Sequence, residues 1–131
     1  MKLNYDCLRK ILLTIESDIC WHDDLTFCYT NLAALTETLS DFSRAEIAYA
    51  SKMAIEANLI EARIMDCDTC IIDIHYYGLS FEGHQFLDTV RENKIWTKTK
   101  RIISAAGGAS LSIIKEIASN CITAFIKGQL S

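Results

Sequence analysis

The hydrophobic pattern of residues 58–87 constrains the fold more than any other part of this chain. Apolar side chains recur at every second position in residues 60–65 and again in residues 70–76, which is the period of a β-strand. Between these two runs lies a short acidic segment, Asp-Cys-Asp at residues 66–68. Two strands joined by a tight turn predict an antiparallel β-hairpin.

Helical signals flank this hairpin on both sides. Ser43 is followed three residues later by Glu46, which is a capping-box pattern, and it predicts a third helix that ends near Asn58. Asn58 tolerates the left-handed conformation that commonly follows a helix. After the hairpin, Ser80 is the expected N-cap of another helix, with Glu82 in its first turn. A helix, a hairpin and a returning helix are typical of a winged helix, in which the hairpin is the wing.

The chain before this region predicts two more helices and one strand. Asn4 is a suitable N-cap for a first helix, whose apolar residues follow the helical period. Residues 25–29 alternate and are rich in β-forming side chains, so we expect the first strand of the small sheet there. Thr30 or Asn31 then caps a second helix that ends near Asp41.

Two helices are expected in the C-terminal part of the chain. One runs from Asn93 to the break at Gly107-Gly108, and the other begins after Ser110. The last helix is apolar over more than one face, which the surface helix of a monomer does not need. We therefore expect a homo-oligomer that assembles through this helix. The expected contact residues are Leu111, Ile114, Ile117, Cys121, Ile122 and Phe125.

Together these patterns predict a winged helix-turn-helix domain over residues 1–91 and a helical extension over residues 92–131. The fold class is mainly α with a small antiparallel β-sheet. A chain of 131 residues is long enough to bury a single core without disulfides or metal. Because half of the residues are apolar and proline is absent, we expect the chain to be folded almost throughout.

The charge distribution argues against a strongly basic nucleic-acid binder but leaves one basic segment. The formal net charge is −4, whereas phosphate contacts from Lys and Arg supply most non-specific affinity for nucleic acid. Residues 1–66 carry 6 basic and 11 acidic side chains, and residues 67–131 carry 7 and 6. The basic cluster consists of Arg91, Lys94, Lys98, Lys100 and Arg101.

Two surfaces are candidates for binding DNA or a partner. The third helix has the recognition position of a winged helix, but its exposed cations are only Arg44 and Lys52, and the wing turn is acidic. Lys94, Lys98 and Arg101 recur at helical spacing and predict a basic stripe. The same charges would also suit a helix face that is simply solvated. We therefore favour the stripe over the third helix as a nucleic-acid surface.

The cysteines raise the question of a metal site. Cys67 and Cys70 form a C-x-x-C pattern in the hairpin turn, the spacing with which zinc knuckles present two thiolates, but a closed site needs two more ligands. Cys20, His22 and Cys28 would complete it only if the first strand brought them near that turn. Otherwise we expect reduced thiols, no metal and no cofactor. Because the N-terminus lacks the apolar segment of a signal peptide, we expect a cytoplasmic protein.

No other pattern indicates chemistry. Lys115 and Glu116 interrupt the most apolar region, so no membrane-spanning segment is expected. His84 and Asp88 are four residues apart, but the neighbouring Gly83 favours a structural role in close packing. Catalytic serine triads, phosphate-binding glycine loops and zinc-protease motifs are absent from the sequence. We predict no catalytic residues and do not expect an enzyme.

Several blocks of this sequence resemble a known family. They are Asn58-Leu59-Ile60-Glu61-Ala62, Leu79-Ser80-Phe81-Glu82-Gly83-His84-Gln85-Phe86-Leu87-Asp88, and Trp96 with Lys98, Lys100 and Gly107-Gly108. The chain resembles the small prokaryotic family catalogued as domain of unknown function 2513. This resemblance implies a winged helix with a helical C-terminal extension, often encoded by prophages. The family usually has Gly in place of Asn58 and His in place of Ala50.

Two functions from different classes are consistent with this sequence. The first is a regulatory winged-helix protein of mobile-element type that binds nucleic acid as an oligomer through the basic stripes of several subunits. The second is a protein-interaction module, in which the acidic N-terminal half and wing bind a host or phage protein and DNA is not involved. Neither function is that of an enzyme.

Overall fold

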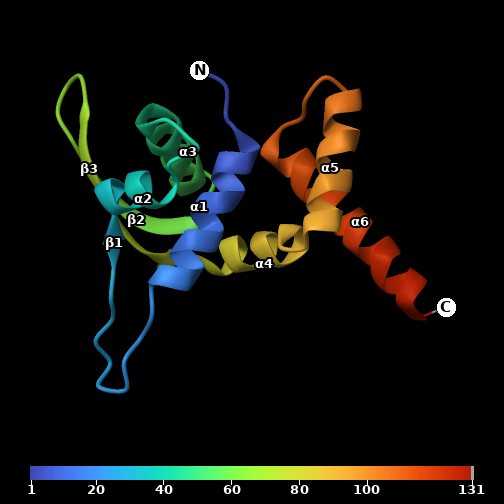
Figure 1. The fold of residues 1–131 in the computed structure, drawn as a ribbon, viewed down its shortest axis with the longest axis horizontal. Coiled ribbons are helices and arrows are strands. Elements are labelled where there is room, and N and C mark those ends of the chain that lie inside the picture. The colour runs from blue at the N-terminus through green and yellow to red at the C-terminus, as the bar shows by residue number, and fades with distance from the viewer. Residues whose placement is uncertain (131) are drawn as a thin grey trace. The chain divides into compact units, whose positions relative to one another are not determined.

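The structure, a computed structural model, describes residues 1–130 and the side chains of residues 1–128. The chain divides into two compact units, Met1–His84 and Gln85–Ser131. Within residues 1–130 it forms six helices and one three-stranded antiparallel sheet (Figure 1). The predicted class, mainly α with a small antiparallel sheet, is confirmed.

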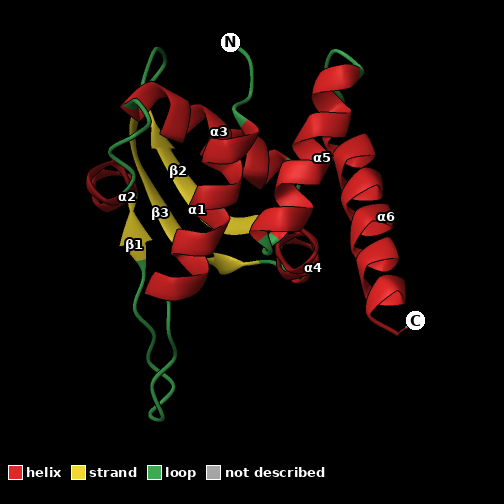
Figure 2. Ribbon diagram, turned by 45° about the vertical axis from the view of Figure 1, so that its right-hand side comes forward, coloured by secondary structure: helices red, strands yellow, loops and turns green. Residues whose placement is uncertain are grey.

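The elements follow one another in an order that places the sheet in the first unit. They are α1 (Tyr5–Asp18), β1 (Thr30–Asn31), α2 (Leu32–Thr38), α3 (Arg44–Glu56), β2 (Ile60–Asp66), β3 (Ile71–Leu79), α4 (Phe81–Val90), α5 (Asn93–Ala105) and α6 (Leu111–Leu130). The strand order in the sheet is β1-β3-β2, with β3 in the centre (Figure 2). Helices α1, α2 and α3 all contact this sheet.

The predicted hairpin is present as β2 and β3. Ile64 lies opposite Ile74, and Ala62 lies opposite Tyr76. Ile74 and Tyr76 are fully buried, as the alternation in the sequence predicts. Because Ile60 at the start of β2 is also buried, both strands of the hairpin contribute side chains to the core.

The base of this hairpin is held by the turn into α4. Asn58 adopts the predicted left-handed conformation, with φ of 59°. The Ser80 hydroxyl donates to the Asn58 carbonyl and accepts from the Gly83 N–H at 2.9 Å, so Ser80 is both the N-cap of α4 and a link to the end of α3. A β-carbon at Gly83 would overlap the Leu59 carbonyl, so only glycine fits this position.

The helix caps predicted for α1 and α3 are confirmed and are joined to each other. Asn4 accepts from the Cys7 N–H, and Ser43 and Glu46 form the capping box. The Asn4 side-chain amide also donates to Glu46 at 3.0 Å. This hydrogen bond from Asn4, with a smaller contribution from the Ser43 backbone N–H, lowers the pKa of the Glu46 carboxyl.

The core of the first unit includes buried polar groups that are paired. The Tyr76 hydroxyl lies 2.7 Å from the Ser51 hydroxyl, which in turn lies 2.7 Å from the Ile47 carbonyl.

Burial raises the pKa of the Tyr76 phenol above its usual value of 10.0. Burial also raises the pKa of the Cys7 thiol to about 11, with a further contribution from the Glu46 carboxylate. Both groups are therefore neutral in the core at neutral pH.

The prediction of a strand over residues 25–29 is wrong. The strand in this region, β1, contains only Thr30 and Asn31, which pair with Tyr76 and His75. The preceding residues instead turn back on themselves, because Leu25 has a left-handed φ of 68° and Phe27 pairs with Trp21. We call residues 19–29 the exposed hairpin. Asn31, rather than Thr30, caps α2 by accepting from the Ala34 N–H.

The second unit contains α5 packed against α6. Gly107 and Gly108, with φ of 80° and 119°, end α5 where the sequence predicts a break. The Ser110 hydroxyl then accepts from the Ile113 N–H at the start of α6. None of the helices in residues 1–130 is long and apolar enough to cross a membrane.

Candidate functional site

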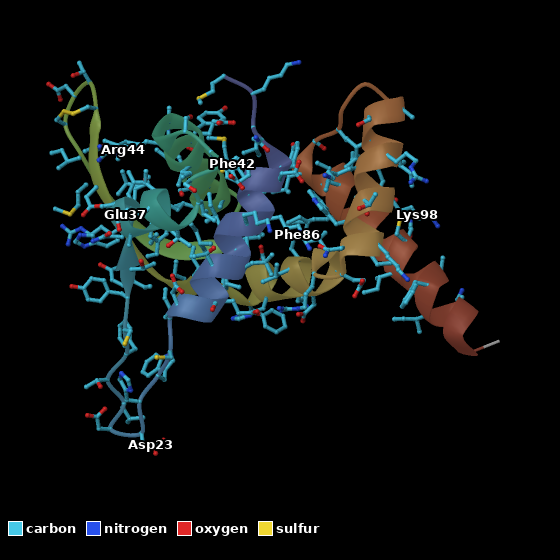
Figure 3. The ribbon with its side chains drawn as sticks, in the orientation of Figure 1. Asp23, Glu37, Phe42, Arg44, Phe86 and Lys98 are labelled. Atoms are coloured by element: carbon cyan, nitrogen blue, oxygen red, sulfur yellow. A yellow bond between two sulfur atoms is a disulfide. The ribbon has the colours of Figure 1, made fainter. Side chains whose placement is uncertain are left out.

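The basic stripe predicted on α5 exists as an exposed surface. The side chains of Lys94, Lys98 and Arg101 are exposed, while Ile95 and Trp96 on the same helix are buried. The three cations line a shallow surface pocket of about 400 Å³ together with Asn93 and Thr97. All five lining residues come from α5, and Figure 3 labels Lys98 among them. This surface therefore presents cations and polar side chains without a carboxylate among the residues that line it.

The other two members of the basic cluster do not join the stripe. Arg91 donates to the Asp88 carboxylate at 3.0 Å, so its charge is partly compensated. The Lys100 ammonium lies 5.9 Å from the centre of the Trp96 ring, within range of a cation–π interaction. Lys94, Lys98 and Arg101 therefore share one exposed surface, whereas Arg91 and Lys100 each interact with a neighbouring side chain.

The predicted nucleic-acid surface on α3 carries few cations. Arg44 and Lys52 are both exposed, but α3 contributes no other cation, and the two are eight positions apart. At the tip of the β2–β3 hairpin, Asp66 and Asp68 are exposed and carry negative charge. A DNA backbone that approached this hairpin tip would meet carboxylates, which repel phosphates.

The two cysteines of the C-x-x-C pattern form a disulfide. Cys67 and Cys70 are bonded to each other at the turn between β2 and β3, and the Cys67 N–H also donates to the Cys70 carbonyl at 2.8 Å. The prediction of reduced thiols throughout the chain is therefore wrong for this pair. In this form the two sulfurs are not available as thiolate ligands.

Cys20, His22 and Cys28 lie together without Cys67 and Cys70. Their ligand atoms are all within 4.8 Å of one another, and His22 Nε2 lies 3.4 Å from Cys28 Sγ. The exposed hairpin that carries them and the β2–β3 turn project from opposite ends of the sheet in both Figure 1 and Figure 2. Cys67 and Cys70 therefore do not share a metal site with Cys20, His22 and Cys28. Sequence reasoning missed the separate trio because it expected a strand where the chain forms a hairpin.

His84 and Asp88 do not act as the pair that their spacing suggests. His84 Nδ1 lies 3.9 Å from Glu16 Oε2 on α1, while the Asp88 carboxylate binds Arg91. Each side chain thus has a different partner. The neighbouring Gly83 is explained by close packing against Leu59, as the sequence predicts.

The residues predicted to mediate self-association are divided between the interior and the surface. Ile114 and Cys121 are buried within the chain, and Phe125 is exposed. Leu111, Ile117 and Ile122 are partly exposed. Among the described side chains of residues 85–128, the most exposed large apolar ones are Ile102, Ile113, Phe125 and Ile126, of which sequence reasoning named one. Helical periodicity alone could not show which face of α6 packs against α5.

A set of exposed aromatic side chains lies in the first unit. Trp21 and Phe27 stack on one face of the exposed hairpin, with ring centres 4.9 Å apart. The Tyr29 ring lies near His75 and Tyr77 on β3, with ring centres 5.9 and 6.2 Å away. Trp21 is 68% exposed, an unusual state for a tryptophan in a folded chain. Such exposure is typical of surfaces that bind a partner.

Comparison with known proteins identifies the family. The family model described as "Hypothetical protein (DUF2513)" matches residues 2–109. The chain belongs to the DUF2513 family. An uncharacterized protein of Haemophilus influenzae is 29% identical over 124 residues, which cover 94% of this chain and 97% of that relative. No solved structure matches the chain. The DUF2513 match includes the exposed hairpin and the α5 stripe, whereas α6 lies outside it.

Proposed function

We propose that this protein is a regulatory winged-helix protein of mobile-element type that binds nucleic acid as an oligomer. The observation that carries the proposal is the exposed stripe of Lys94, Lys98 and Arg101 on α5. No carboxylate is among the residues that line the pocket of these cations, which suits contact with a phosphate backbone, and such contacts release counterions from it. The proposal involves no catalytic step.

The order of elements supports the winged-helix part of the proposal. The first unit follows the order helix, strand, helix, helix and hairpin, with the hairpin strand β3 between β1 and β2. In that arrangement α3 would have the recognition position and the β2–β3 hairpin would be the wing. The sparse cations on α3 and the acidic turn favour α5 as the surface that contacts phosphate.

Oligomerisation would increase the affinity for nucleic acid, because the three cations of one subunit can make only a few phosphate contacts. Three phosphate contacts predict a slope of about −2.7 for log K against log salt, and a dimer that uses both stripes would double it. The exposed side chains of Ile113, Phe125 and Ile126 on α6 support self-association of the second unit. Light scattering should show an oligomer for the full chain and a monomer for Phe125→Glu/Ile126→Glu. A monomeric full chain would contradict this part of the proposal.

Mobility shifts on generic duplex DNA test the nucleic-acid proposal. The full chain should shift the duplex at low salt, and the shift should weaken steeply as salt rises. The variant Lys94→Ala/Lys98→Ala/Arg101→Ala should abolish it, whereas Arg44→Ala/Lys52→Ala should leave most of it. All five side chains are exposed, so both variants should fold normally. Absence of a shift at every salt concentration would eliminate DNA binding.

The exposed aromatic set supports a second candidate, a protein-interaction module. Trp21, Phe27 and Tyr29 are large exposed side chains in a segment that also carries Asp23 and Asp24. Buried aromatic anchors carry much of the affinity of protein interfaces. Affinity purification from the native host should then recover one stoichiometric protein, and Trp21→Ala or charge reversal at the β2–β3 turn should release it. Recovery of nucleic acid alone would contradict this candidate.

A further inference from the structure

The exposed hairpin has a defined backbone. The Cys28 N–H donates to the Cys20 carbonyl at 3.1 Å, and the His22 N–H donates to the Thr26 carbonyl at 2.7 Å. The Leu25 N–H donates back to the His22 carbonyl at 2.9 Å. These bonds enclose a three-residue loop whose last residue is left-handed, which is a common hairpin connection. The register of the side chains on the two arms is therefore fixed.

That register collects the metal-binding side chains on one face. Because Trp21 pairs with Phe27, the facing pairs on either side are Cys20 with Cys28 and His22 with Thr26. Side chains alternate along a strand, and opposed residues share a face. Cys20, His22 and Cys28 are thus on one face, whereas Trp21 and Phe27 stack on the other. The spacing Cys-x-His with a second Cys six residues further on gives this face two sulfurs and one imidazole.

The spacing of the ligand atoms suits a tetrahedral ion. With Zn–S near 2.3 Å and Zn–N near 2.1 Å, neighbouring ligand atoms of a tetrahedral zinc site are about 3.5–3.8 Å apart. His22 Nε2 and Cys28 Sγ are 3.4 Å apart, and all three ligand atoms lie within 4.8 Å of one another. Small side-chain rotations would close the set around an ion without moving the backbone.

We propose that Cys20, His22 and Cys28 bind one Zn²⁺ ion at the exposed hairpin. Cys20 and Cys28 bind as thiolates after each releases its proton to solvent, and His22 binds through a neutral ring nitrogen. Water completes the tetrahedron, because the fourth position on this face is Thr26, whose hydroxyl donates to the Asp24 carboxylate at 2.6 Å. The site therefore has three protein ligands and one open position.

The surroundings favour a thiophilic cation. Two thiolates and an imidazole select Zn²⁺ over Mg²⁺ or Ca²⁺, which prefer oxygen ligands. Residues 18–29 contain three aspartates and no Lys or Arg, so the local charge attracts cations. All three ligands are exposed, which gives an ion direct access. Cys20 and Cys28 are free thiols in the structure, in contrast to Cys67 and Cys70.

Metal titration of the untagged full chain tests the site. Under a phosphine reductant, calorimetry with Zn²⁺ should give one ion per chain. Co²⁺ as a probe should give the intense visible bands of a tetrahedral complex and a thiolate charge-transfer band. Mutation of a residue that only orients a metal ligand costs about 10–100-fold in affinity. Because Cys20→Ser/Cys28→Ser removes two of the three protein ligands, it should lower the Zn²⁺ affinity by about 100-fold or more. His22→Ala should remove the tetrahedral cobalt spectrum.

The matched control is Cys67→Ser/Cys70→Ser, which removes the other exposed pair of cysteines that the reductant would free. This variant should keep the stoichiometry and affinity of the wild type. Binding that survives in Cys20→Ser/Cys28→Ser, binding that is lost in the control, or no binding by the wild type would each overturn the proposal. Because the three ligands and the two cysteines of the control are all exposed, circular dichroism should show the same fold for every variant.

Discussion

Two hairpins of the first unit carry paired cysteines, and they are built in opposite ways. The β2–β3 hairpin contributes Ile74 and Tyr76 to the core, and its base is held by Ser80 and Gly83. The exposed hairpin of residues 19–29 is held mainly by its own backbone hydrogen bonds. The β2–β3 hairpin therefore contributes to the core, whereas the exposed hairpin presents large side chains outside the core. Functional chemistry is more readily placed on the second.

The largest effect should come from the base of the β2–β3 hairpin. Gly83→Ala should lower the free energy of unfolding by about 3 kcal/mol, because the new methyl group must displace the Leu59 carbonyl. Chemical denaturation monitored by circular dichroism measures the change. Gly128→Ala in α6 is the control, since its added β-carbon would lie within 4 Å of no atom beyond its chain neighbours and its own turn of helix. Equal stability of Gly83→Ala and the wild type would show that the close packing of Gly83 on Leu59 does not stabilise the fold.

A smaller effect is expected where β3 meets α3. Because the Ser51 hydroxyl proton is directed to the Ile47 carbonyl, Tyr76 donates to Ser51. Ser51→Ala should then cost about 2 kcal/mol, since the buried phenol loses its acceptor. Tyr76→Phe should cost about 1 kcal/mol, and the double variant should cost less than the sum. Strict additivity in denaturation experiments would mean that the two hydroxyls do not interact.

The same tyrosine predicts a loss of stability at alkaline pH. Burial raises the pKa of the Tyr76 phenol above 10.0 in the folded chain, so the folded state resists its ionisation. The resulting stabilisation is complete below pH 10 and declines as the pH rises above it. Unfolding free energies measured from pH 8 to 11 should fall more steeply for the wild type than for Tyr76→Phe. Parallel curves would show that the phenol titrates equally in both states.

The smallest effects compare the two left-handed residues. Asn58 at the base of β2 has φ of 59°, and Leu25 in the exposed hairpin has φ of 68°. Asn58→Ala should cost about 1 kcal/mol and Asn58→Gly almost nothing. Leu25→Gly relieves strain in the exposed hairpin, whose hydrogen bonds lie mainly within the hairpin itself, so we expect the global free energy of unfolding to change by less than about 0.5 kcal/mol. Hydrogen exchange at the Cys28 amide would detect that local change, and a large global change would show that the exposed hairpin unfolds with the core.

Much of the fold was predictable from local signals. The caps at Asn4, Ser43 and Ser80, the left-handed Asn58 and the glycine break after α5 all depend on neighbours in sequence. The strand over residues 25–29 was mispredicted because its alternating pattern suits any hairpin arm, whether or not it joins the sheet. Similarly, periodicity showed that α6 is apolar but not that Ile114 is buried while Ile113 is exposed.

The sequence by itself determined most of the helices, the caps of α1, α3 and α4, the β2–β3 hairpin and the positions of the basic residues, because these features depend on residues only a few positions apart. Tertiary structure decided which of those residues act together. It placed Lys94, Lys98 and Arg101 on an open surface and gave Arg91 and Lys100 local partners. It also separated the two cysteine pairs, because the end of the sheet from which each hairpin projects depends on contacts between residues that are far apart in the sequence.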